Sequence, residues 1–197
     1  MRLALKEAAQ LEGSDLNDDA HQALVSDLQV LHVIGRSLPA EAKFDPVMLR
    51  EIVDLPGVDH VVHGVDCAAL RAAGDPRSEI VARLCEAPET GSRGVRVEWW
   101  FGQVPVQVRG RCDDGPVTAL DIAPRAGQDG ERSTLEVDAI VSAIGFRAGS
   151  ADLIGDLGPQ DETAVSTGRV EPGLYLAGWA RRGPRGTIPS QRADARE

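Results

Sequence analysis

The sequence predicts an α/β fold, and three features of the chain carry that prediction. Residues 2–84 alternate helical and extended patterns, as in a sheet whose strands are joined by helices. Residues 95–122 turn to β-structure and contain a hairpin signal. Residues 136–146 are almost continuously apolar, which is typical of a strand buried on both faces of a parallel sheet. This order indicates the second half of one Rossmann-like domain, followed by the closing part of another.

Capping residues and helical spacing place four helices in the first part of the chain. Pro46 opens one of them, and the Pro-Gly pair at residues 56–57 stops it. Asp75 has the features of an N-cap, and Pro76 suits the first turn because its missing N–H would have no partner there. The expected helices cover residues 2–10, 20–25, 46–55 and 76–84.

Short apolar runs bounded by turn residues give the expected strands. Two of these runs are linked by Asp-Asp-Gly at residues 113–115, which indicates a hairpin. Residues 125–133 form a polar loop rather than a linker between domains. The expected strands cover residues 29–34, 58–62, 95–101, 105–111, 116–122, 136–146 and 173–177.

Composition narrows the classes of function. The chain has 197 residues, 42% of them hydrophobic, and a formal net charge of −10. It can therefore bury a core, and its acidity disfavours nucleic acid as a partner. No run approaches the roughly 18 apolar residues that a membrane helix needs. The charged N-terminal residues do not fit a secretory signal, so we expect a cytoplasmic protein without a membrane span.

The spacing of cysteine and histidine argues against a structural metal or an iron–sulfur cluster. Cys67, Cys85 and Cys112 are scattered and form no Cys-x-x-Cys pair. We expect them to be buried or free thiols, as suits a reducing cytosol. His60 and His63 form a His-x-x-His pair without an acidic or cysteine companion, so we predict no metal site there.

The segment from Gly178 to Ser190 combines an aromatic residue with a basic, glycine-rich loop. The short apolar strand at residues 173–177 leads into it, and Thr187 can cap a helix that starts after the loop. Because the first N–H groups of a helix are unpaired and its dipole is positive there, this arrangement suits an anionic or electron-rich ligand. The alternative is a solvated basic turn, but Trp179 beside the loop favours ligand binding.

The run from Trp179 to Ile188 resembles the signature of the adrenodoxin reductase-like ferredoxin–NADP reductases, Gly-Trp-x-x-Arg-Gly-Pro-x-Gly-x-Ile. The resemblance implies a flavoprotein fold of the glutathione reductase type, with two dinucleotide-binding domains and a β-meander. It implies FAD and NADP as cofactors, with Trp179 and Gly186 packed near the flavin and the nicotinamide. The backbone N–H groups of Gly186, Thr187 and Ile188 would meet the pyrimidine end of the flavin, where reduced flavin carries negative charge.

A second part of the resemblance lies at the end of the first expected strand. An Arg after such a strand accommodates the 2′-phosphate of NADP, where an acidic residue would hold the 2′-hydroxyl of NAD. Residues 35–44 resemble the family's Gly-Arg-Arg-Gly-Pro segment, with Arg36 as the first Arg and Ser37 in place of the second. Met48 replaces the acidic residue that the family usually places before a Leu-Arg pair. With one guanidinium instead of two, we expect weak NADP preference or mixed use of NAD(P)H.

The resemblance extends over the whole chain, yet the chain is well under half the family's usual length. It contains no Gly-x-Gly-x-x-Gly or Gly-x-Gly-x-x-Ala loop, which the family uses for the FAD and NADP pyrophosphates. We expect residues 1–137 to be the second half of the NAD(P)-binding domain with the β-meander. Residues 138–197 would close the FAD-binding domain. The chain is then a truncated reading frame, or a fragment that needs the missing N-terminal half or a partner chain.

The resemblance implies an FAD-dependent NAD(P)H:ferredoxin-type oxidoreductase that passes electrons to a small iron–sulfur protein. The flavin would supply the chemistry, so we name no catalytic side chain. Arg50 and Arg77 fall near positions at which the family meets its acidic partner. Two alternatives stay open: a non-catalytic remnant or accessory nucleotide-binding module, and a related oxidoreductase of the glutamate synthase small-subunit type.

Overall fold

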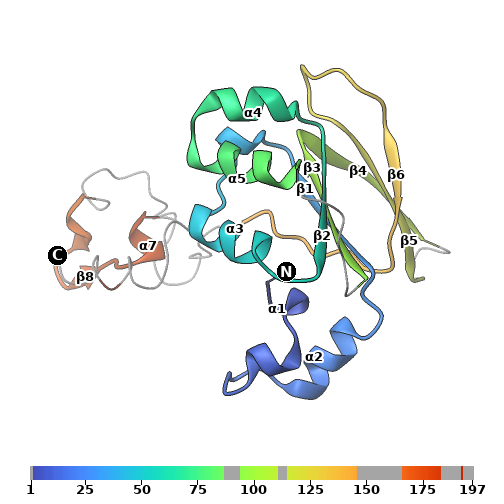
Figure 1. Ribbon diagram of the computed structural model, residues 1–197. Coiled ribbons are helices and arrows are strands. Elements are labelled where there is room, and N and C mark those ends of the chain that lie inside the picture. Colours follow the sequence, from blue (N-terminus) through green and yellow to red (C-terminus); the bar gives the residue numbers. More distant parts are fainter. Residues whose placement is uncertain (1, 87–93, 111–114, 146–165, 183–191, 193–197) are drawn as a thin grey trace. The chain divides into compact units, whose positions relative to one another are not determined.

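The computed structural model describes residues 2–86, 94–110, 115–145, 166–182 and 192 (Figure 1). The chain divides into two compact units, Met1–Ile140 and Val141–Glu197. The first unit holds a parallel sheet with its helices and an antiparallel meander, and the second holds a two-stranded ribbon and a short helix. No helix in the described ranges is long and apolar enough to pass through a membrane.

A three-stranded parallel sheet forms the centre of the first unit. Its strands lie in the order β1-β3-β2, so the strand that comes last in the sequence lies between the other two. All three strands were expected from the sequence, within one or two residues at their ends. The strands are β1 (Val30–Gly35), β2 (Val58–His63) and β3 (Val95–Phe101).

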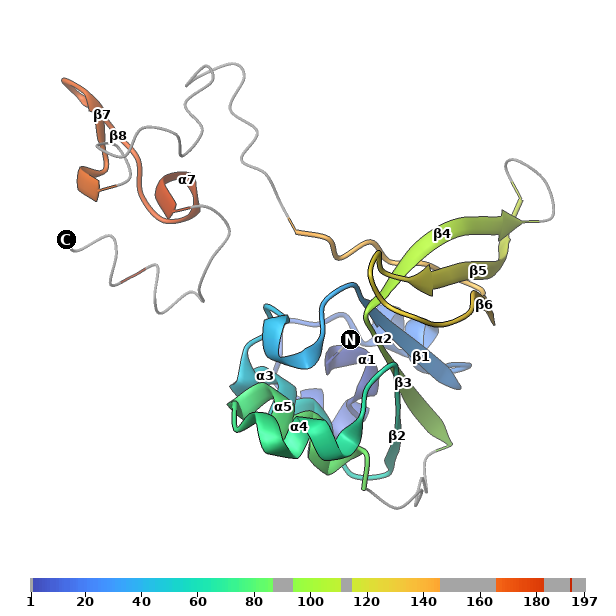
Figure 2. The same cartoon turned by 90° about the horizontal axis from the view of Figure 1, so that it is seen from above.

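Three helices cover one face of this sheet, as Figures 1 and 2 show. Each begins after an aspartate whose carboxylate accepts two backbone N–H groups of the first turn: Asp45, Asp66 and Asp75. The first and third of these helices confirm the prediction, with proline as the first helical residue. The second is an addition to the expected elements. The helices are α3 (Pro46–Val53), α4 (Cys67–Ala73) and α5 (Pro76–Leu84).

The main core lies between these helices and the sheet. Alternate residues of β3 point toward the helices, and Val97, Trp99 and Phe101 are at most 5% exposed. Leu49 and Ile52 of α3 and the apolar side of α5 complete this core. The remaining residues of β3 therefore face the opposite side of the sheet.

An antiparallel meander continues from the parallel sheet through Gly102. Its strands lie in the order β4-β5-β6, which confirms the expected hairpin and meander. Leu120, Ile122 and Leu135 form a second, smaller core, against which Trp100 of the parallel sheet packs. The strands are β4 (Gln103–Gly110), β5 (Val117–Pro124) and β6 (Ser133–Glu136).

One continuous helix was expected at residues 2–10, and this prediction is wrong, because the region forms a short α-helix followed by a separate 3₁₀ helix. Glu7 has the extended backbone of an N-cap (φ −75°, ψ 154°) and forms a capping box with Gln10, which ends one helix and starts the next. Leu5 nevertheless reaches the main core. The elements of this region are α1 (Arg2–Leu5), η1 (Ala8–Leu11) and α2 (Asp18–Val25).

The expected buried strand at residues 136–146 is also wrong within its described part. Only Glu136 lies in a strand, and residues 137–145 have none. Val141 and Ile144 are 89% and 96% exposed. A strand needs a neighbour for its backbone hydrogen bonds, and no strand in the described part of the chain pairs with this segment. Phe146 lies outside the described residues.

Buried or free thiols were expected at all three cysteines, and this prediction is wrong for two of them, because Cys67 and Cys85 form a disulfide. Cys67 is the first residue of α4, and Cys85 follows the last residue of α5. The two helices pack together, which brings these positions to a Cα–Cα distance of 6.2 Å. Cys112 lies outside the described residues.

The second unit contains β7 (Arg169–Glu171), β8 (Leu174–Tyr175) and α7 (Trp179–Arg182). The strand expected at residues 173–177 is therefore shorter than predicted. The guanidinium of Arg181 is buried and donates to the carbonyl of Ser166 at 2.6 Å, which ties the helix to the chain before β7. The expected helix start near Thr187 lies outside the described residues.

Candidate functional site

The three parallel strands end at one edge of their sheet, which is where open α/β sheets bind ligands. β1 ends at Gly35, and Arg36 follows it with an exposed side chain. Among the described residues, no carboxylate forms an ion pair with this guanidinium. The structure therefore holds an exposed cation at the position where the sequence predicts contact with a nucleotide phosphate.

The turn after Arg36 has a defined shape. The carbonyl of Leu38 accepts the N–H groups of Glu41 and Ala42, both at 3.0 Å, and these bonds close the 3₁₀ turn η2 (Pro39–Glu41). Pro39 is among the most fully buried side chains of the chain. Burial of Pro39 thus fixes the turn on the protein, and Arg36 lies three residues before Pro39.

The meander holds this turn at two points. The N–H of Gly102 donates to the carbonyl of Ser37 at 3.3 Å, and the carbonyl of Gly102 accepts the N–H of Arg125 at 2.8 Å. The guanidinium of Arg125 donates to the carboxylate of Glu41 at 2.7 Å. This hydrogen bond and the positive charge of Arg125 lower the pKa of Glu41.

Backbone packing at the same edge is close. Gly64 follows β2 with φ +76°, and a Cβ built there would lie 2.4 Å from the carbonyl oxygen of Phe101. Glycine is therefore required, because a side chain would displace the end of β3. The start of the loop after β2 thus lies against the end of β3.

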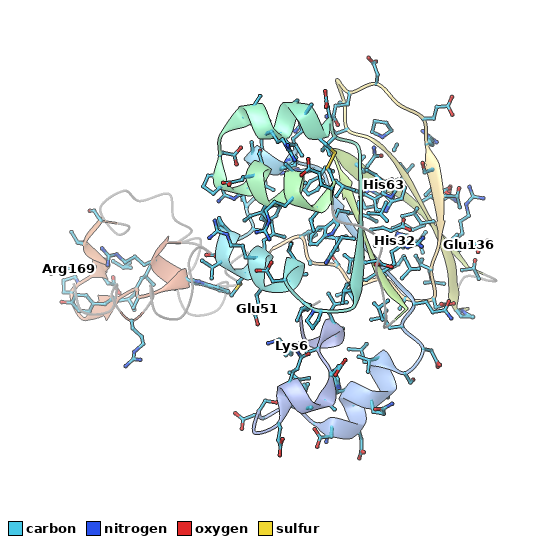
Figure 3. All side chains as sticks on the ribbon, in the orientation of Figure 1. Lys6, His32, Glu51, His63, Glu136 and Arg169 are labelled. Carbon is cyan, nitrogen blue, oxygen red and sulfur yellow. A yellow bond between two sulfur atoms is a disulfide. The ribbon has the colours of Figure 1, made fainter. Side chains whose placement is uncertain are left out.

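The sheet face away from the helices carries a polar cluster. His32 and His63 lie on this face (Figure 3), and their ring nitrogens are 3.4 and 3.5 Å from one carboxylate oxygen of Glu98. The indole N–H of Trp100 donates to His32 Nδ1 at 3.2 Å, and the ring of His63 stacks on Trp100 at a centroid distance of 3.8 Å. Burial lowers the pKa of His32, although the charge of Glu98 opposes this effect.

The His-x-x-His pair cannot bind one ion, because its two imidazoles lie on opposite faces of β2. His60 points into the main core, where its Nδ1 accepts the indole N–H of Trp99 at 3.2 Å. His63 belongs to the polar cluster on the other face. No group of three metal-binding side chains occurs within the described residues.

The predicted partner-binding arginines occupy different environments. Arg50 lies on α3 and is exposed. Arg77 lies in the first turn of α5 and is half-buried, and its Nε donates to the carbonyl of Phe44 at 3.0 Å. Arg77 thus holds the far end of the segment that begins at Arg36.

The predicted flavin contacts fall mostly outside the described part of the chain. Trp179 is the first residue of α7 and is 48% exposed. Gly186, Thr187 and Ile188 lie outside the described residues. The ion pair between Arg125 and Glu41 was not predicted from the sequence. The two residues are 84 positions apart and lie in no motif, so only the folded chain brings them together.

No family model matches the chain. Among curated proteins, cindoxin reductase from Citrobacter braakii is 30% identical over 203 residues, which cover 100% of this chain and 42% of that protein. NADPH-ferredoxin reductase FprA from Mycobacterium tuberculosis is 27% identical and matches 100% of this chain and 47% of its own length. Mitochondrial NADPH:adrenodoxin oxidoreductase from Bos taurus is 29% identical, with 98% and 45% covered.

Solved structures give the same result. The structure of Mycobacterium tuberculosis FprA in complex with NADPH superimposes with a TM-score of 0.73 at 25% identity, covering 98% of this chain and 47% of that one. The chain thus spans less than half the length of the relatives that it matches. Its fold is part of the glutathione reductase-type flavoprotein fold, and its homologues are ferredoxin and adrenodoxin reductases, which confirms the predicted resemblance to these reductases.

Proposed function

We propose that this chain provides the pyridine-nucleotide part of an FAD-dependent NADPH:ferredoxin-type oxidoreductase. One observation carries the proposal. The chain matches NADPH-dependent reductases over its whole length and presents Arg36, without a carboxylate partner among the described residues, at the carboxyl edge of the parallel sheet. A guanidinium in this place fits the 2′-phosphate that distinguishes NADPH from NADH.

The residues of the chain have binding and orienting roles in this proposal. Arg36 would pair with the 2′-phosphate, and the end of β3 with the loop packed against it after β2 would border the nucleotide. Trp179 and the backbone of Gly186, Thr187 and Ile188 would lie beside the flavin, as the resemblance implies. When bound, the nicotinamide and the flavin supply hydride transfer and single-electron transfer. A small iron–sulfur protein such as ferredoxin would be the electron acceptor.

The binding of NADPH and NADH to the chain tests this proposal. We expect NADPH to bind more tightly, because only NADPH carries the 2′-phosphate. Replacing Arg36 by Ala should weaken NADPH binding by roughly tenfold, on the scale of one charge-assisted hydrogen bond, and leave NADH binding nearly unchanged. Isothermal titration of both proteins with both nucleotides measures this. Equal losses for the two nucleotides would mean that Arg36 supports the fold and does not read the phosphate.

A second candidate function is a non-catalytic nucleotide-binding module. The observation in its favour is that the sequence has no Gly-x-Gly-x-x-Gly or Gly-x-Gly-x-x-Ala loop for a pyrophosphate. For both candidate functions we expect the purified 197-residue chain to be colourless. The predicted contacts of the Gly186–Ile188 backbone with the flavin cannot replace a glycine-rich loop that binds the FAD pyrophosphate. Absorbance at the flavin wavelengths checks this expectation. A stoichiometric flavin spectrum that copurifies with the chain would contradict it and favour the enzyme.

A further inference from the structure

The turn that carries Arg36 is joined to a distant part of the chain by a closed ring of hydrogen bonds. We propose that Arg125, acting through Glu41, is a positioning residue for Arg36 and sets the selectivity of this site for a nucleotide 2′-phosphate. This inference rests on the function proposed above.

The backbone part of the ring fixes the first end of the turn. Ser37 follows Arg36 directly, and its carbonyl accepts the N–H of Gly102. The carbonyl of Gly102 in turn accepts the N–H of Arg125. Gly102 is buried and has φ +67°, a conformation that glycine adopts without strain. The meander therefore reaches the turn beside Arg36 through two consecutive backbone bonds.

The side-chain part of the ring fixes the second end. Glu41 closes η2, and its carboxylate accepts the guanidinium of Arg125 at 2.7 Å. The side chains of Glu41 and Arg125 are 54% and 33% exposed, so the ion pair lies at the surface of the protein. Ser37 and Glu41 are both held at the same end of the meander, by Gly102 and Arg125 respectively, so the backbone that carries Arg36 has little freedom to turn away.

Charge gives Arg125 a second effect on the same turn. Glu41 is five residues after Arg36, and its carboxylate would repel a 2′-phosphate and attract the Arg36 guanidinium if it were left without a partner. Arg125 neutralises this carboxylate. Ser37 stands where the resembled family has a second Arg, so Arg36 alone would bind the 2′-phosphate. The affinity for this phosphate therefore depends more strongly on how the Arg36 guanidinium is oriented.

Titration of the chain with 2′,5′-ADP and with 5′-ADP, followed by NMR, tests the inference. We expect Arg125→Ala to weaken 2′,5′-ADP binding about fivefold and 5′-ADP binding less than twofold. In the Glu41→Gln background the same substitution should cost less than twofold, because the charge through which Arg125 acts is gone. Arg125→Lys should retain most of the wild-type selectivity. Arg109→Ala is the matched control, since Arg109 forms an ion pair with Asp121 within the same meander.

Three results would overturn the inference, and they can be told apart. Equal weakening of both nucleotides by Arg125→Ala would mean that Arg125 only supports the fold. A fivefold loss that persists in the Glu41→Gln background would mean that Arg125 contacts the phosphate itself. A loss with Arg36→Ala but none with Arg125→Ala would refute the inference and leave the proposed function standing. If Arg36→Ala has no effect, or if the wild-type chain does not bind 2′,5′-ADP, the proposed function fails as well.

Discussion

At the scale of single residues, Gly64 shows how closely the binding edge is packed. Its left-handed backbone and the nearby carbonyl of Phe101 both exclude a side chain. We expect Gly64→Ala to lower the free energy of unfolding by roughly 2–4 kcal/mol, from left-handed strain together with displacement of β3. Gly74 is the matched control, because it has φ +68° but open space around its Cβ position, and Gly74→Ala should cost only about 1 kcal/mol. Equal losses in urea unfolding would show that the contact with Phe101 is unimportant.

His60 makes the stability of the first unit depend on pH. Burial in the main core lowers the pKa of this imidazole, while the charge of Asp59 opposes the shift. The unfolded chain therefore binds a proton near pH 6.5 that the folded chain does not bind until lower pH. The contribution of neutral His60 to the free energy of unfolding is therefore complete above pH 6.5, and it is lost as the pH falls through the pKa of His60 in the folded chain. His32, whose pKa is also lowered by burial, acts in the same direction.

This pH dependence can be measured by urea unfolding at pH 7.5 and pH 5.5. His60→Gln keeps an acceptor for the indole N–H of Trp99 but cannot titrate. We expect the variant to be less stable than wild type at pH 7.5 and to lose less stability on acidification. If His60→Gln lost as much unfolding free energy as wild type between pH 7.5 and pH 5.5, another group would cause the acid sensitivity.

At the scale of secondary-structure elements, the Cys67–Cys85 disulfide joins the start of α4 to the end of α5. Its cysteines are 18 positions apart, and closing a loop of this length removes entropy from the unfolded chain. We expect the Cys67→Ser/Cys85→Ser double variant to lose about 2–4 kcal/mol of unfolding free energy under non-reducing conditions. Cys112→Ser is the control and should change little. A reductant should destabilise wild type and leave the double variant unaffected, and equal responses would contradict the disulfide.

The helix surfaces give a prediction about the electron acceptor. Arg50 on α3 and Arg77 on α5 are the proposed contacts with an acidic iron–sulfur protein. In an enzyme restored with a flavin half, reversing both charges should slow cytochrome reduction through ferredoxin, most strongly at low salt. Ferricyanide reduction should barely change, because this small acceptor needs no docking surface. A defect that ignored ionic strength, or that affected both activities equally, would assign the two arginines to the fold, consistent with the bond from Arg77 to Phe44.

The elements also show how far the sequence can predict this protein. Strands and capped helices with local signals were predicted well, such as α5 with Asp75 and Pro76 at its start. α4 was missed although Asp66 caps it, because its short alanine-rich run lacks a strong apolar period. The Arg125–Glu41 contact and the disulfide could not be predicted, because they depend on tertiary packing and not on local sequence. Residues 137–145 carry a strong strand pattern without a neighbouring strand among the described residues.

For the molecule as a whole, the proposed function depends on where the nucleotide binds. The parallel sheet has two ends, and the carboxyl end presents Arg36, the η2 turn and the close contact of Gly64 with the end of β3. The match to known reductases covers the whole chain but less than half of each relative. The location of the site on this chain is therefore the claim to test first.

Mapping of backbone amide shifts on addition of NADP⁺ locates the nucleotide site. We expect the largest shift changes at the carboxyl edge of the sheet, at Arg36, Ser37, Glu41 and Gly64. NAD⁺ at the same concentration should produce smaller changes at Arg36 and Ser37, because it lacks the 2′-phosphate. Changes concentrated at the opposite end of the sheet near Val58, or identical maps for the two nucleotides, would refute this location of the nucleotide site.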